Sequence, residues 1–202
     1  MRAWFLPRDI DVMALLRDQA GMVGAGLDEL ADWVSGSTPA RRATESLRER
    51  LTGERATSRA VHAAVRASFS TPLEGEDIFE LTERLGELAE ATYNLVREAE
   101  ITATPADWGL QGIVAPIVDG GRTALRAVVR LPAAAAGEIG DRAVAELSLA
   151  EHAYRAAIVD LEQEDDLRRE VRRRELYRRA EHLTASAVRL GRRVSYAVYK
   201  EG

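Results

Sequence analysis

The chain has 202 residues, of which 46% are hydrophobic and 30% charged, a composition typical of a folded globular protein that can bury a core as one domain. It contains no cysteine, which excludes disulfides, thiolate nucleophiles, zinc fingers and iron–sulfur clusters. The net charge of −5 disfavours a general attraction to nucleic acid. Because no export signal and no long uncharged apolar run is visible, we expect a cytoplasmic protein without a transmembrane segment.

Apolar residues at helical spacing predict two helices in the first part of the chain, at about 8–35 and 39–68. Thr38 is expected to cap the second helix, with Pro39 at its first position. Gly53 is expected to weaken that helix. The apolar stripe of the first helix consists of Val12, Leu15, Leu16, Val23, Leu27, Leu30 and Val34.

A third helix is predicted at about 75–101, after an extended connector forced by Pro72. The fourth, at about 105–131, is the least regular, with Thr104-Pro105 as its cap and start. Pro116 is expected to kink it. Gly120-Gly121 is expected to break it locally, since each glycine costs about 1 kcal/mol against alanine.

A loop at 131–140 and two further helices at about 141–163 and 166–199 complete the prediction. Three leucines of the third helix recur 95 positions later in the sixth, which suggests an internal repeat: Leu81, Leu88 and Leu95, then Leu176, Leu183 and Leu190. The predicted fold class is therefore all-α, one domain over 1–202. It consists of six long antiparallel helices in two pseudo-repeated three-helix halves, about 1–103 and 104–202.

The histidines offer little for catalysis. His152 and His182 end matching Ala-Glu-His triplets, and they would form a metal or acid/base site only if their two helices faced each other. No third ligand lies nearby, and no metalloprotease or nucleophile-elbow motif occurs. We interpret these two histidines and His62 as structural or surface residues, and we predict no catalytic residue.

Acidic residues at 160–166 give way abruptly to arginines at 168–179. This charge switch is compatible with a docking strip for an acidic partner or anionic lipid headgroups, but its primary role is expected to be a solvated helix face. Four favourable i,i+4 pairs support the solvated face: Glu164–Arg168, Asp165–Arg169, Glu170–Arg174 and Glu175–Arg179.

Residues 67–79 read Ala-Ser-Phe-Ser-Thr-Pro-Leu-Glu-Gly-Glu-Asp-Ile-Phe. The stretch resembles the helix–Thr-Pro–Asp/Glu–Asp-Ile-Tyr/Phe signature of small PhoU-like phosphate transport regulators, a family formerly of unknown function. Phe5-Leu6-Pro7-Arg8-Asp9 resembles the start of that family, and 175–201 its last helix. The resemblance spans the chain without a large gap. It implies a six-helix, two-fold-repeated bundle that acts through partners, among them Pit-type inorganic phosphate transporters.

The resemblance also implies where metal ligands would lie. Members of the family carry Glu/Asp-x-x-x-Asp motifs on four helices, and their paired carboxylates hold iron, zinc or similar cations. In this chain the pairs fall on Leu51 and Arg55, Gly86 and Glu90, Leu147 and Glu151, and Glu181 and Ala185. Only Glu90, Glu151 and Glu181 remain as remnants, with Glu87 beside them. We therefore expect no cofactor, and a multinuclear metal site that is lost or reduced to weak, adventitious binding.

The function that follows is a non-enzymatic cytoplasmic accessory protein of inorganic phosphate transport. It would bind a Pit-type transporter, peripherally at the inner membrane face. Two alternatives stay open, a PhoU-fold interaction scaffold with a different partner and a metal-binding helical bundle. The expected partner is a membrane phosphate transporter and not nucleic acid; homo-oligomerisation stays open.

Overall fold

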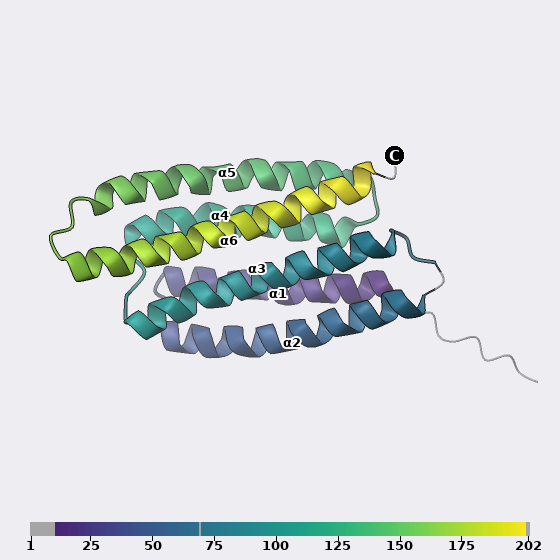
Figure 1. Ribbon diagram of the computed structural model, residues 1–202, viewed down its shortest axis with the longest axis horizontal. Coiled ribbons are helices and arrows are strands. Elements are labelled where there is room, and N and C mark those ends of the chain that lie inside the picture. The colour runs from purple at the N-terminus through teal and green to yellow at the C-terminus, as the bar shows by residue number, and fades with distance from the viewer. Residues whose placement is uncertain (1–10, 69, 201–202) are drawn as a thin grey trace, which may run out of the picture.

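The computed structural model describes residues 11–68 and 70–200. These residues form six helices and no strand, and the helices run back and forth along the long axis of the molecule (Figure 1). The predicted all-α bundle is thus confirmed. The helices are α1 (Val12–Val34), α2 (Ala40–Ala67), α3 (Gly75–Thr102), α4 (Trp108–Arg130), α5 (Ala135–Leu161) and α6 (Leu167–Tyr199).

The helices pack as two groups of three. α1, α2 and α3 contact one another, as do α4, α5 and α6. The two groups meet along two seams, where α1 packs against α4 and α3 packs against α6. α2 and α5 lie on opposite outer sides of the molecule (Figure 1). None of the described helices combines the length and hydrophobicity that crossing a bilayer requires.

The core lies along the predicted apolar stripes. Every residue of the α1 stripe is buried except Leu15, which is partly buried against the core. All six leucines of the suspected repeat are buried as well, three on α3 and three on α6, and these two helices contact each other. Burial of such side chains contributes roughly 1.5–3 kcal/mol each, so these stripes determine which faces of the helices meet.

The predicted starts of α2 and α4 are wrong. α2 begins at Ala40, because Pro39 keeps an extended backbone (ψ 144°) and is itself the cap, in place of Thr38. α4 begins at Trp108 and not at Pro105. Its cap is Asp107, whose carboxylate accepts from the backbone N–H of Leu110 at 2.8 Å and so satisfies a donor that the helix leaves open.

The predicted break in α4 is also wrong, and so is the length of the loop after it. α4 runs without interruption from Trp108 to Arg130, through Pro116. A Cβ at Gly120 would lie 2.6 Å from Leu147 Cγ of α5, and one at Gly121 would lie 2.8 Å from Leu27 Cδ1 of α1. The two glycines therefore let neighbouring helices approach closely, a packing role that helix propensity does not reveal. α5 starts at Ala135, six residues before the predicted 141.

Candidate interaction surface

The three metal-motif remnants lie apart from one another. Glu90 is on α3 and Glu151 is on α5, two helices that do not contact each other within the described residues. Glu90 pairs with Arg55 of α2 at 3.8 Å, and Glu151 pairs with Arg155 one turn along its own helix. Glu181 is exposed on α6. Each remnant carboxylate is thus either solvated or already next to a guanidinium.

The other halves of the motif pairs do not fit a cation either. Leu51 is buried in the core, and Arg55 brings a positive charge to Glu90. No group of three metal-ligating side chains occurs in the part of the chain that the structure describes. The residues present do not fit a multinuclear cluster. Loss of the metal stays a prediction, which elemental analysis of protein purified without chelator will check.

A buried carboxylate that the sequence analysis missed lies beside this region. Glu54 of α2 is 2% exposed and packs over Gly86, where a Cβ would lie 3.3 Å from its Oε1. Gln19 Nε2 donates to that oxygen at 2.7 Å and to the carbonyl of Thr82 at 2.9 Å. Burial raises the pKa of Glu54, and the Gln19 hydrogen bond opposes that rise. This arrangement ties α1, α2 and α3 together, with no ion pair to Glu54 among the described residues.

The histidines do not converge. His152 and His182 are exposed, and His152 Nδ1 lies 3.0 Å from the carbonyl of Ser148 on its own helix. His62 stacks on Phe79, with ring centroids 4.4 Å apart, and its Nε2 lies 3.5 Å from Glu83 Oε1. The stacked pair joins α2 to α3.

The stretch that resembles the PhoU-like family joins α2 to α3 and α3 to α6. Leu73 and Ile78 are buried. Asp77 is 0% exposed and forms an ion pair with Arg193 of α6, and its other oxygen lies 3.7 Å from Lys200 Nζ. Phe69 and the N-terminal stretch Phe5–Asp9 lie outside the described residues. In the described part, this segment performs a packing role.

The charge switch near residue 160 is largely neutralised. Two of the four predicted pairs form, Glu170–Arg174 at 2.7 Å and Glu175–Arg179 at 2.9 Å. The other two do not form, because Glu164 and Asp165 precede α6 and therefore lack helical i,i+4 geometry. Glu164 instead contacts Arg169 at 3.7 Å and Arg173 at 3.2 Å.

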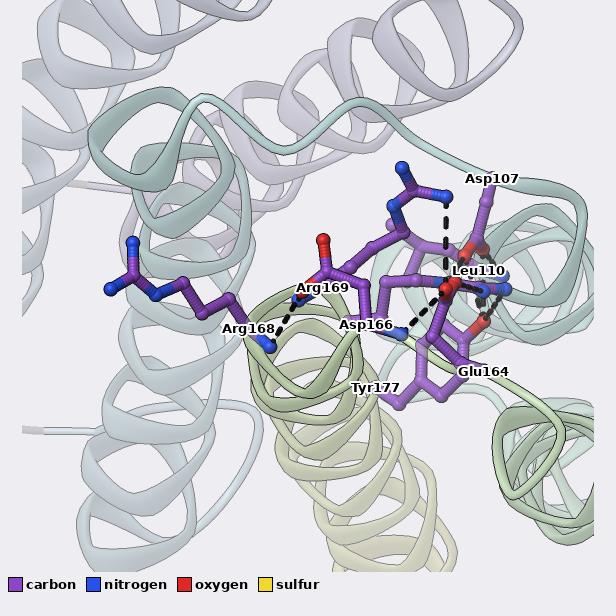
Figure 2. Close-up of polar contacts among 8 residues, drawn as sticks. Asp107, Leu110, Glu164, Asp166, Arg168, Arg169 and Tyr177 are labelled. Atoms are coloured by element: carbon purple, nitrogen blue, oxygen red, sulfur yellow. Dashed lines mark hydrogen bonds and ion pairs between the residues drawn. The ribbon is translucent and has the colours of Figure 1, made fainter.

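Asp107 is the centre of this charged region, and the sequence analysis had given it no role. Figure 2 shows its carboxylate facing Tyr177 of α6, whose hydroxyl donates to Asp107 Oδ2 at 2.9 Å. Arg173 forms an ion pair with the same carboxylate. Burial and the Asp107 hydrogen bond raise the pKa of Tyr177 to about 12, so the phenol stays protonated at neutral pH. The contacts fix the start of α4 against α6. In the sequence, only the preference of Asp for helix N-caps could have pointed to Asp107.

A pocket of about 710 Å³ opens beside these contacts, between the 103–107 linker and the first turns of α6. Arg168 and Arg172 line it, and neither has an ion pair among the described residues. Figure 2 shows the Arg168 side chain extending away from the Asp107 contacts, while its backbone N–H donates to Asp166 at 2.9 Å. The lining combines four arginines with three carboxylates, Asp107, Glu164 and Asp166.

No family model and no curated protein matches the chain. Among solved structures, the chain is similar to a crystal structure from Shewanella oneidensis MR-1 that is named as a PhoU-like phosphate regulatory protein. The two share 14% sequence identity with a TM-score of 0.63, over 94% of this chain and 99% of that one. At this identity the likeness concerns architecture. The protein has the PhoU-like fold.

Proposed function

We propose that this protein is a non-enzymatic regulator of inorganic phosphate transport that binds a Pit-type transporter from the cytoplasmic side. The observation that supports this most is the likeness of nearly the whole chain to a protein named as a PhoU-like phosphate regulator. The Thr71-Pro72 to Asp77-Ile78-Phe79 segment gives separate support. The described residues also offer recessed surfaces suited to binding a partner.

The test is co-purification and transport in the source organism. A tagged copy should retain the Pit-type transporter after membrane solubilisation, and deletion of the gene should change phosphate uptake. Complementation with the wild-type gene should restore uptake. Absence of the transporter from the complex, together with unchanged uptake in the deletion strain, would contradict the proposal.

A second candidate is a PhoU-fold scaffold with a different partner. The replacement of every paired carboxylate motif favours it, because Leu51 and Arg55 stand where the family places ligands. A stable complex with some other protein, in a strain whose phosphate uptake is unaffected, is the outcome that separates this candidate from the first.

A further inference from the structure

Three arginines form a stripe on α4. Arg122, Arg126 and Arg130 are spaced four residues apart and project from one face of the helix. Like charges at this spacing destabilise a helix by roughly 0.2–0.5 kcal/mol per pair. Arg122 is compensated by Asp28 of α1 at 2.6 Å. Arg126 donates to Thr123 Oγ1, which in turn donates to Glu146. Neither Arg126 nor Arg130 has a carboxylate at ion-pair distance among the described residues.

The stripe borders a groove of about 730 Å³ between α1 and α4. Arg142 also lines the groove, but it is compensated by Glu146 at 3.0 Å. At one recess of a chain whose net charge is −5, Arg130 therefore has no ion pair among the described residues, and Arg126 reaches Glu146 only through the Thr123 hydroxyl. An anionic partner at this place would remove the repulsion within the stripe and gain charge-assisted hydrogen bonds.

The floor of the groove is apolar and includes two glycines. A Cβ at Gly21 would have no atom within 4 Å, and one at Gly24 would lie 3.5 Å from Leu125 Cδ1. Val129 is 45% exposed at the side of the groove. Because the glycines carry no side chain, the floor leaves room for an apolar side chain of a partner between α1 and the arginine stripe.

We propose that the α1/α4 groove binds an amphipathic helix of a partner protein. Carboxylates four residues apart on that helix would reach Arg126 and Arg130, since both pairs then repeat at about 6 Å along their helices. An apolar residue between them would lie over Gly21. A recessed groove receives an elongated segment better than a flat bilayer, so the occupant is a helix and not a lipid surface. The inference does not depend on which protein is regulated.

The probe is a synthetic helical peptide of about 20 residues, long enough to be helical, with two glutamates at i and i+4 beside a leucine stripe. A control peptide has the same composition, with both glutamates moved to the opposite face. Fluorescence anisotropy with the full chain should show binding of the first peptide, and at least about tenfold weaker binding of the control. Arg126→Glu/Arg130→Glu should weaken the first peptide by a similar factor.

The chain offers a matched control for that variant. Arg59 and Arg66 of α2 are exposed two helical turns apart and also lack an ion pair among the described residues, so Arg59→Glu/Arg66→Glu makes the same change in charge elsewhere. It should leave affinity within about twofold. Gly21→Leu should fill the groove and abolish binding without lowering the Tm, whereas Gly112→Leu, also in open space, should leave binding unchanged.

Four results would overturn the proposal. These are no binding of the glutamate peptide to the wild-type chain, equal binding of the control peptide, and equal losses in the two double-arginine variants. The fourth is binding to phosphatidylserine-containing vesicles that is lost in Arg126→Glu/Arg130→Glu, which would make a lipid headgroup the occupant. Phosphate uptake is not measured in any arm, so failure here leaves the proposed regulatory function standing.

Discussion

The two seams that join the halves of the molecule are built in opposite ways. α3 carries eight acidic residues and two arginines, and α6 carries ten arginines and three glutamates. Ion pairs cross the α3/α6 seam at three levels: Asp77–Arg193, Glu87–Arg189 and Glu98–Arg179. The α1/α4 seam instead relies on close approach, with Gly121 against Leu27. A single ion pair, Asp28–Arg122, crosses it in the described residues.

The difference shows what each seam specifies. Opposite charge along α3 and α6 favours their pairing, and the positions of the matched residues fix an antiparallel alignment. Glycine contacts specify a distance instead, because only a bare Cα lets the backbones approach. On α6 the seam arginines form ion pairs with α3, whereas on α4 Arg126 and Arg130 form no direct ion pair in the described residues. The α3/α6 seam therefore has a carboxylate opposite each of these arginines, whereas the α1/α4 seam leaves charge for a partner.

The largest expected effect comes from the buried end of the ionic seam. Asp77→Asn leaves Arg193 uncompensated beside a fully buried site, and removal of one partner of a buried pair costs about 3–5 kcal/mol. Urea unfolding followed by circular dichroism measures this cost. Glu98→Gln, which breaks the more exposed pair with Arg179, should cost less than about 1 kcal/mol. Equal costs would mean that burial does not rank the pairs of this seam.

The sequence was sufficient for the helices and their buried faces. Apolar residues that recur about every 3.6 positions give a helix one apolar face, whichever helix packs against it. This explains the burial of Leu81, Leu88 and Leu95. The sequence did not predict the packing role of Gly120 and Gly121. Propensity assigns a cost to a glycine in a helix, but the benefit depends on Leu147 and Leu27 arriving from other helices, which is tertiary information.

The second largest expected effect comes from filling the close contact between α1 and α4. Gly121→Val forces side-chain atoms against Leu27 and should destabilise the protein by about 2 kcal/mol, a Tm decrease of roughly 4–8 °C. Gly112→Val on the same helix meets no atom within 4 Å, so it should keep or slightly raise the Tm. Thermal unfolding of both variants measures the contrast. A higher Tm for Gly121→Val would show that α1 and α4 do not need the close approach.

Replacing Glu54 shows whether a buried carboxylate without an ion pair destabilises the packing of α1, α2 and α3. Glu54→Gln keeps an acceptor for Gln19 Nε2 and offers a donor to Gln19 Oε1, which has no hydrogen-bond partner in the described part of the chain. It should stabilise the protein by about 1 kcal/mol at neutral pH. Since the folded-state pKa of Glu54 is raised, the wild-type chain is penalised at pH values above it. The advantage of Glu54→Gln should therefore shrink as the pH falls through that pKa.

The candidate surfaces were less accessible to sequence reasoning than the helices. The charge switch was visible, but half of its predicted pairs fail because Glu164 lies before α6 and reaches Arg173 instead. The four-residue spacing of Arg122, Arg126 and Arg130 was also visible, and it gained meaning only when Asp28 proved to match one of the three. Spacing shows which charges share a face, whereas compensation depends on the neighbouring helix.

The smallest expected effect is the difference in stability between replacing Arg189 in the α3/α6 seam and replacing Arg126 beside the groove. Glu87 and Arg189 are each about 40% exposed, so a double-mutant cycle with Glu87→Gln and Arg189→Gln should give a coupling of only about 0.2–1 kcal/mol, reduced at high salt. Although partial burial opposes it, hydrogen bonds from Arg84 and Arg189 lower the pKa of Glu87, so this coupling should be lost as the pH falls through that lowered value. Arg126→Gln should instead leave stability unchanged or slightly raised, because it removes like-charge repulsion within the stripe. A loss of stability in Arg126→Gln as large as that in Arg189→Gln would mean that the groove arginine already stabilises the isolated fold, and the contrast between the seams would fail.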